Sequence, residues 1–213
     1  MKLLSVAIPC YNSQEYMRKC IDSLLKGGED VEIIVVNDET PDNSMSIVYR
    51  LSSHYPDKIK IIHQQNKGLG GARNTGVAAA NGDYIIFLDS DDYIHPHMLR
   101  DLSSRIDSSE PDMIIFSFLS VDLAGKTLSK YGVCTNEHLC LTAAEKIPLI
   151  LTVPAAWNKV YRRSFYIESA IYFPEKTLYE DCVTRALLFR ARSILCCPNY
   201  WYYYVQRNNS IMH

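Results

Sequence analysis

The sequence predicts an α/β fold, with a mostly parallel twisted sheet flanked by helices, in a single domain spanning residues 1–213. In the first half, short apolar runs alternate with segments of helical periodicity across short connections, which is typical of repeated βα units. The 213 residues are 47% hydrophobic, enough to bury one sizeable core. No repeat, linker or low-complexity segment divides the chain. We expect a regular α/β half over about 1–110 and a mixed half over about 111–213.

Four strands and three helices are expected in the first half. Runs rich in β-branched and aromatic residues predict the strands, at Leu3–Ile8, Val31–Val36, Ile59–Ile62 and Tyr84–Leu88. The first helix begins at a capping-box-like Asn12–Glu15 and stops at Gly27-Gly28. The second opens at Pro41–Ser44. The third is Ala-rich and runs from a glycine-rich loop, Lys67–Gly71, to Ala80.

The second half has a looser rhythm. It predicts a strand at Met113–Leu119, a helix at Thr142–Leu151 with an awkward interior Pro148, an extended segment at Ala156–Tyr161, a helix at Asp181–Arg190 and an aromatic strand at Tyr200–Val205.

Charge and hydropathy bound the partners and the compartment. The net charge is -2, from 22 Lys+Arg and 24 Asp+Glu, so no global field favours nucleic acid. The apolar start, Met1–Pro9, is too short for a signal peptide. No apolar stretch approaches the ~20 residues of a membrane span. We therefore expect a cytoplasmic protein, with peripheral association at the inner face of the membrane left open.

The cysteines indicate reduced thiols. There are 7 of them at irregular spacing, which fits a cytosolic protein better than a disulfide framework. Cys196-Cys197 has no second Cys pair or His pair at ligand spacing, so these thiols are interpreted as structural.

Three carboxylates follow the fourth apolar run, in Asp89-Ser90-Asp91-Asp92. A buried parallel strand that ends in Asp-x-Asp places both carboxylates where α/β folds bind ligands. Like charges this close repel unless a cation or hydrogen-bond donors neutralise them. A divalent ion that carries the phosphates of a substrate would do so. The alternative is an acidic turn that caps the following helix.

The other strand ends of the first half also carry polar residues. They are Pro9–Asn12, Asn37-Asp38 and the glycine-rich loop, and strand ends of one parallel sheet converge on one cleft. Tyr11 could stack on a base, or it could be a packed aromatic. Asp38 could accept from base or ribose groups, or it could cap the helix near Pro41.

The glycine-rich segment Gly68–Asn74 is not a dinucleotide fingerprint. Arg73 stands at the third glycine position, and the loop follows the third strand instead of the first. We interpret Gly70 and its neighbours as allowing close backbone approach to a ligand, with Arg73 binding phosphate or orienting the Asp cluster. A tight turn alone is the alternative.

Two adjacent carboxylates, Glu180-Asp181, precede the helix of the second half. They are either favourable charges at a helix N-terminus or the source of a general base. The Asp cluster alone also resembles the first motif of haloacid-dehalogenase-type phosphatases, but Tyr93 stands where Thr or Val is expected.

Taken in order, these motifs are similar to those of the family 2 glycosyltransferases of GT-A fold. The resemblance covers nearly the whole chain and rests on the following segments: Val6–Asn12, Val35–Asp38 with Asp42-Asn43-Ser44, Asn66–Asn74, Phe87–Asp92, Trp157–Tyr161 and Glu180-Asp181.

The resemblance implies inverting transfer of a sugar from a nucleotide diphosphate donor to an acceptor hydroxyl. It makes 1–110 the nucleotide-binding half and 111–213 the acceptor-side half. By position, the nucleotide-sugar site comprises Pro9, Tyr11, Asn12, Asp38, Gly70, Arg73, Asn74, Asp89 and Ser90. Asp91, with Asp89, would hold Mg²⁺ or Mn²⁺, and Asp181, beside Glu180, would be the general base.

The resemblance also implies a setting and raises one alternative. Relatives of this kind act in the synthesis of cell-surface polysaccharides or oligosaccharides, most often with uridine donors, on saccharide or lipid-linked saccharide acceptors. Glu39 and Pro41 differ from the residues that family members commonly carry in the loop after the second strand. Many relatives continue beyond the position of His213, so we expect a chain truncated at its C-terminus. A catalytically impaired nucleotide- or sugar-binding domain of the same fold is therefore the alternative.

Overall fold

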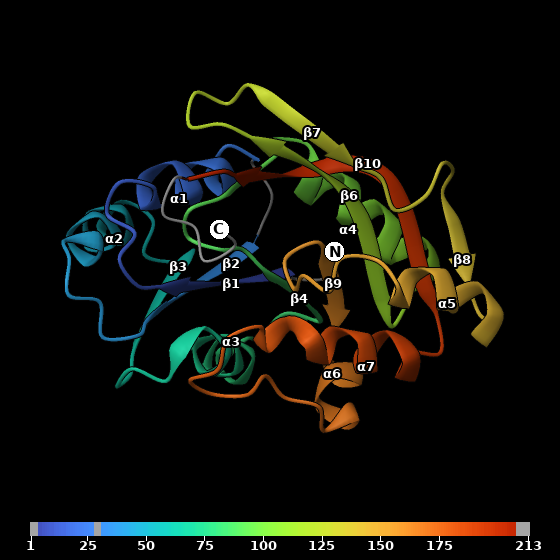
Figure 1. Ribbon diagram of the computed structural model, residues 1–213. Helices are drawn as coiled ribbons and strands as arrows, with labels where there is room; N and C mark the ends of the chain where they lie inside the picture. Colours follow the sequence, from blue (N-terminus) through green and yellow to red (C-terminus); the bar gives the residue numbers. More distant parts are fainter. Residues whose placement is uncertain (1–3, 28–30, 208–213) are drawn as a thin grey trace.

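One sheet of ten strands forms the centre of the computed structural model, which describes residues 4–27 and 31–207 (Figure 1). The strands along its main path are ordered β3-β2-β1-β4-β9-β6-β10-β5, and β7 and β8 pair with β6 and β10. Leu3 and Gly28, where the sequence predicted a strand start and part of a helix stop, lie outside the described residues.

The first half of the sheet is parallel. β1 (Leu4–Cys10) pairs with β2 (Val31–Asn37) on one side and with β4 (Tyr84–Phe87) on the other, and β2 pairs with β3 (Ile59–His63). All four strands therefore point the same way, and their carboxyl ends lie at one edge of the sheet. The predicted α/β fold class is confirmed.

The second half of the sheet is mixed, as expected. β9 (Lys159–Arg162) lies antiparallel between β4 and β6 (Met113–Val121), and β10 (Ile194–Val205) runs parallel to β6. Three short strands add antiparallel pairs: β5 (Tyr93–Ile94), β7 (Thr127–Tyr131) and β8 (His138–Cys140).

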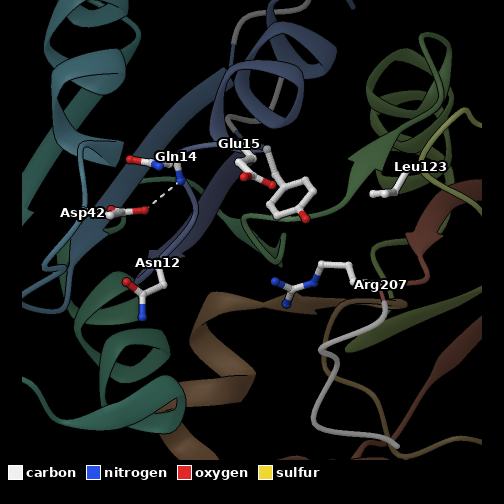
Figure 2. Close-up of a pocket in the computed structure, with 7 residues that line it drawn as sticks. Asn12, Gln14, Glu15, Asp42, Leu123 and Arg207 are labelled. Atoms are coloured by element: carbon white, nitrogen blue, oxygen red, sulfur yellow. Dashed lines mark hydrogen bonds between the residues drawn. The ribbon is translucent and has the colours of Figure 1, made fainter.

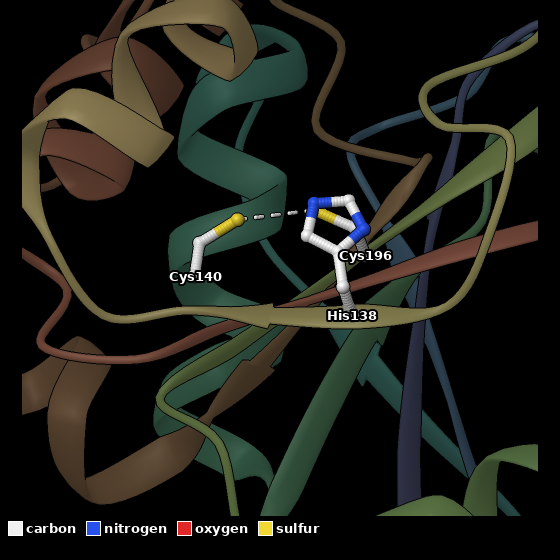
Figure 3. Close-up of side chains that lie close together, drawn as sticks. All are labelled: His138, Cys140 and Cys196. Carbon is white, nitrogen blue, oxygen red and sulfur yellow. Dashed lines mark hydrogen bonds between the residues drawn. The ribbon is translucent and has the colours of Figure 1, made fainter.

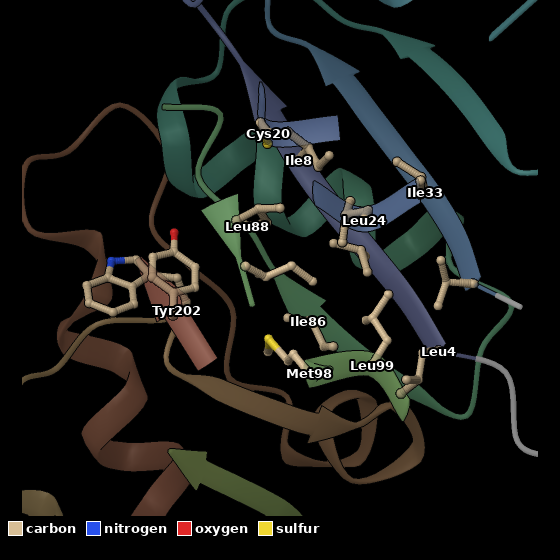
Figure 4. Close-up of a cluster of buried hydrophobic side chains, with 14 of the residues drawn as sticks. Leu4, Ile8, Cys20, Leu24, Ile33, Ile86, Leu88, Met98, Leu99 and Tyr202 are labelled. Carbon is tan, nitrogen blue, oxygen red and sulfur yellow. The ribbon is translucent and has the colours of Figure 1, made fainter. Parts of the chain in front are cut away.

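Helices cover both faces of the sheet, because successive residues of a buried strand face opposite sides. Along β1, Leu4, Val6 and Ile8 belong to one buried cluster, to which α1, α2 and α4 contribute, whereas Ala7 belongs to the other, to which α3, α6 and α7 contribute. Figure 4 shows Leu4 and Ile8 of the first cluster beside Leu24 of α1 and Leu99 of α4. The helix bounds are α1 (Met17–Leu25), α2 (Ser44–His54), α3 (Gly68–Ala79), α4 (Met98–Ser109), α5 (Ala143–Ile150), α6 (Arg163–Ser169) and α7 (Val183–Arg190).

Two helix starts differ from the sequence-based prediction. The capping box expected at Asn12–Glu15 is absent: α1 begins at Met17, and the Ser13 hydroxyl bonds Ser90 Oγ instead, at 2.5 Å. The helix expected from Asp181 begins as a 3₁₀ turn, Glu180–Cys182, which leads into α7. Within the described residues, no helix is both long and apolar enough to cross a membrane.

Candidate functional site

Arg73 joins the two halves of the chain. This side chain is on α3, is fully buried, and donates from Nη2 to Asp89 Oδ1 at 2.8 Å. Its Nη1 donates to Glu180 Oε1 at 2.8 Å and also to Asp181 Oδ1. Burial alone would lower the pKa of Arg73, but the three carboxylates outweigh it and raise that pKa. One guanidinium therefore fixes the Asp cluster after β4 against the carboxylates before α7.

Asp181 has the properties of a base that titrates near neutrality. Its side chain is 21% exposed, and its Oδ2 accepts a hydrogen bond from Ala156 N at 3.1 Å. Burial raises the pKa of Asp181 to about 6, with Asp89 and Glu180 adding to the rise and Arg73 opposing it. A general base works best with a pKa near the operating pH. Glu180 bonds the same guanidinium but is more deeply buried, at 9% exposed, so Asp181 is the more accessible of the two carboxylates.

Asp91 forms an ion pair with a second arginine, Arg207. Burial and the charge of Asp89 raise the pKa of Asp91, and Arg207 opposes that rise. The Arg207 guanidinium also lies over the ring of Tyr16, 5.3 Å from the ring centroid. No sequence signal predicts this partner, because the place of Arg207 depends on β10 running beside β6 and β5.

Ser90 and Asp92 bond within the protein. Ser90 is buried against Ser13. The Asp92 carboxylate accepts from Tyr202 Oη at 2.7 Å and from Val205 N at 2.7 Å. Burial raises the pKa of Asp92 well above its usual range. The acidic-cap interpretation is therefore wrong for Asp92, since β5 follows it and its carboxylate fastens β10.

Asp38 stabilises the start of α3. Its Oδ1 accepts from Lys67 N at 2.8 Å and from Gln64 Nε2 at 2.6 Å, and its Oδ2 accepts from Gly68 N at 2.9 Å. The alternative in which Asp38 caps α2 is wrong, because Asp42 Oδ1 accepts from Ser44 N at that helix, at 3.0 Å.

The glycines of α3 lie against the chain itself. A Cβ at Gly70 would stand 2.2 Å from the carbonyl oxygen of Pro174. The backbone that approaches Gly70 closely is therefore that of the protein itself, at Pro174. Asn74 bonds the backbone of Phe173 twice, donating to its carbonyl at 2.7 Å and accepting from its N–H at 3.0 Å. Both residues therefore fix the segment that leads to Glu180.

The end of β1 opens onto a cavity of about 410 Å³ (Figure 2). Tyr11 is 49% exposed and Pro9 is buried within β1. Asn12 adopts a left-handed conformation, φ 51°, and donates from its N–H to Thr40 Oγ1 at 2.8 Å, a conformation that is rare outside glycine. The cavity is lined by Asn12, Gln14, Glu15, Tyr16, Asp42, Leu123 and Arg207.

Lys159 is a buried cation that the sequence interpretation passed over. Its Nζ donates to the carbonyls of Val153 at 3.2 Å and Ala155 at 2.6 Å, and to Asn158 Oδ1 at 2.7 Å. These bonds hold the turn that presents Ala156 N to Asp181. Nearby, Trp157 stacks on Tyr202, with ring centroids 4.4 Å apart, so this aromatic residue belongs to the core.

Solved structures of a staphylococcal enzyme share this fold. The structure of Staphylococcus aureus TarS in complex with UDP-GlcNAc superposes with a TM-score of 0.83 at 27% identity, covering 100% of this chain and 60% of that one. The complex with UDP gives a TM-score of 0.82 at 27% identity, covering 97% of this chain and 61% of that one. The predicted GT-A fold is thereby confirmed.

Sequence relatives are glycosyltransferases of bacteria. EpsJ of Bacillus subtilis, an uncharacterized glycosyltransferase, is 33% identical over 98% of this chain and 62% of its own length. The poly(ribitol-phosphate) beta-N-acetylglucosaminyltransferase TarS of Staphylococcus aureus is 28% identical over 97% of this chain and 36% of its own length. The chain thus spans about a third to three-fifths of these relatives.

The family profile described as glycosyl transferase family 2 matches residues 5–169. The match includes the ends of β1, β2 and β4, where the candidate donor residues lie, and it decides against the phosphatase interpretation of the Asp cluster. The chain belongs to glycosyl transferase family 2.

Proposed function

We propose that this chain transfers a sugar, with inversion, from a UDP-sugar to an acceptor hydroxyl. Membership of glycosyl transferase family 2 supports the reaction class, and the TarS complexes with UDP and UDP-GlcNAc support the donor class. On the basis of the bacterial relatives, we infer that the acceptor is a saccharide or a lipid-linked saccharide and that the setting is surface polysaccharide synthesis.

One observation carries the proposal: Arg73 binds Asp89 and Asp181 at once. Asp89 belongs to the donor side by motif, and Asp181 is the candidate base on the acceptor side. A single displacement needs the base and the leaving group held on opposite sides of one carbon, within a fixed geometry. A buried ion-pair cluster gives the rigidity that this requires.

The chemistry of the donor set fits a divalent cation. Asp91 and Asp89 offer carboxylate oxygens, the ligands that Mg²⁺ prefers and Mn²⁺ accepts. In the structure Asp91 is paired with the guanidinium of Arg207, which a metal ion would have to displace. We assign Mg²⁺ or Mn²⁺ to Asp91, with Asp89 as second ligand, where the ion would neutralise the charge of the diphosphate.

The residues of the chain then divide the work. Asp181 takes the proton of the acceptor hydroxyl as its oxygen bonds to the anomeric carbon, and the bond from that carbon to the diphosphate oxygen breaks. No covalent enzyme intermediate is needed. Tyr11, which is exposed, is placed at the nucleoside, together with Pro9 and Asn12. Asp38, Gly70, Asn74, Ser90 and Glu180 would act mainly by positioning, since each is engaged within the protein.

The experiment is a screen of UDP-sugars for metal-dependent hydrolysis, with thermal unfolding in the presence of UDP measured alongside. We expect UDP to raise the Tm only with Mn²⁺ or Mg²⁺, as linkage requires of a shared site. Asp91→Asn should remove both effects, whereas Asp107→Asn, exposed on α4, should remove neither. UDP stabilisation without metal would refute the metal assignment. Metal-dependent stabilisation without hydrolysis of any donor would favour the catalytically impaired binding domain.

A further inference from the structure

A cluster of soft ligands lies at the opposite end of β10 from Tyr202 and Val205. His138 and Cys140 on β8 and Cys196 on β10 bring their ligand atoms within 4.8 Å of one another (Figure 3). The two strands pair antiparallel, with His138 directly opposite Cys196. The sequence interpretation found no ligand partner for Cys196, because His138 and Cys140 reach it only through this pairing.

We propose that His138, Cys140 and Cys196 bind a structural Zn²⁺ ion. The sulfur atoms of Cys140 and Cys196 are 3.7 Å apart. Two sulfurs that each lie about 2.3 Å from zinc at a tetrahedral angle are separated by about 3.8 Å. The distance between the two sulfurs of this pair therefore already matches that of two ligands of one zinc ion.

The tautomer of His138 suits a metal ligand. Its Nδ1 lies 2.9 Å from the carbonyl oxygen of Asn136. A carbonyl can only accept, so Nδ1 is the donor here, which leaves Nε2 as the nitrogen that would ligate a metal. Histidine ligands of zinc typically donate their other N–H to a carbonyl or carboxylate in this way.

The fourth position falls to Cys134, which lies on the segment between β7 and β8. Its thiol lies outside the group of three whose ligand atoms are within 4.8 Å of one another, and it would complete the tetrahedron by turning toward them. Cys140 and Cys196 are both buried, and burial raises the pKa of each.

Zinc binding then releases protons. Each thiol that would ligate the ion, of Cys140, Cys196 and Cys134, gives its proton to solvent, because the thiolate is the form that binds metal. The affinity should therefore rise with pH, as it does wherever thiolates bind metal. The ion would fasten β8 to the core beside α5 and α7. Among the described residues, this short strand joins the sheet through β10 alone.

The test uses Co²⁺ as a probe, because a thiolate-to-cobalt charge-transfer band reports sulfur ligands and ignores carboxylate sites such as Asp91. We expect one Co²⁺ per chain with that band, displaced by Zn²⁺. His138→Gln replaces an exposed side chain, so this variant should fold, and it should weaken Co²⁺ binding by more than the roughly 10- to 100-fold that loss of an outer partner costs.

Cys196→Ser should abolish the band and Cys134→Ser should weaken it. The matched control is Cys197→Ser, which changes a buried thiol of the next position, on the other face of β10, and should leave the band intact. Absence of the band in the wild-type chain would overturn the proposal. So would an unchanged band in His138→Gln and Cys196→Ser, or a Cys140–Cys196 disulfide in place of bound metal.

Discussion

Arg73 and Glu180, 107 positions apart in the chain, form a buried ion pair in which Nη1 lies 2.8 Å from Oε1. Arg73→Lys keeps the charge but removes the fork that also reaches Asp89 and Asp181. Leaving buried carboxylates unpaired should cost about 3 kcal/mol or more of unfolding free energy. This loss of unfolding free energy is measured by urea unfolding. Arg18→Lys, at an exposed pair with Asp22, should cost less than about 0.5 kcal/mol, and equal losses in the two variants would contradict the assignment.

The first half of the fold could be predicted because its signals are local. Each of β1 to β4 is one apolar run with a short connection, and sequential βα units leave few topologies open. The place of β9, antiparallel between β4 and β6, could not be predicted. Its residues Lys159–Arg162 carry no sign of which strands they join, since strand pairing is decided by packing across the whole sheet.

The contacts of the candidate site likewise fall into two groups: those within one short segment, which the sequence predicts, and those between distant segments, which it does not. Asp89 and Asp91 share one short segment, so their proximity was predictable from the strand before them. The ion pair of Asp91 with Arg207 and the bonds from Asp38 to the start of α3 join distant segments. For Asp38, local capping rules predicted a bond to the start of α2. Its carboxylate instead accepts from the start of α3, because β2 and β3 are neighbours in the sheet.

Gly70→Ala tests whether this glycine serves packing within the protein. The new Cβ would meet the Pro174 carbonyl at 2.2 Å, and backbone has little freedom to move. We expect a loss of about 1–3 kcal/mol, as for an overpacked core, seen as a lower Tm. Gly132→Ala is the control, because its Cβ would find its nearest neighbour at 3.4 Å. Unchanged stability in Gly70→Ala would show that the segment at Pro174 yields easily.

Arg207→Gln tests whether Arg207 competes with a metal for Asp91. Removing the guanidinium leaves Asp91 beside the like charge of Asp89, which favours a cation. Mn²⁺ should therefore bind several-fold more tightly in the absence of nucleotide, as measured by calorimetry. Arg100→Gln, which changes an exposed side chain of α4, should leave the affinity as it is. Weaker Mn²⁺ binding in Arg207→Gln would mean that this residue supports the metal site.

The pH dependence of transfer should report Asp181. Burial places its pKa at about 6, so kcat/KM should fall as the pH drops through that value and the base becomes protonated. The folded state holds more protons at this group between pH 3.8 and 6. Asp181 therefore stabilises the fold as the pH falls there, so protonation of this group lowers the rate without itself favouring unfolding.

Asp181→Asn gives the complementary result. It should abolish transfer while UDP binding stays within a few-fold of the wild type, because the side chain faces the acceptor in our assignment. Normal transfer by Asp181→Asn, or a rate that stays flat from pH 7 to 5, would assign the base to another group.

Lys159→Met tests the buried ammonium behind the base. Burial lowers the pKa of Lys159 from 10.5 to about 7, so the unfolded chain binds more protons than the folded one between those values. This group should therefore make the wild-type fold more stable as the pH rises from 7 towards 10.5. The stability of Lys159→Met should lack this increase with pH. The stability difference between wild type and variant, from denaturant unfolding, should then grow with pH in favour of the wild type.

The same substitution leaves the carbonyls of Val153 and Ala155 without their donor, which should cost about 1–3 kcal/mol. Because these carbonyls belong to the turn that presents Ala156 N to Asp181, the turn should shift and transfer should slow as well. Lys26→Met, exposed at the end of α1, is the control for loss of a positive charge. A stability difference that is constant from pH 7 to 10 would mean that Lys159 stays charged when folded, held by its three acceptors.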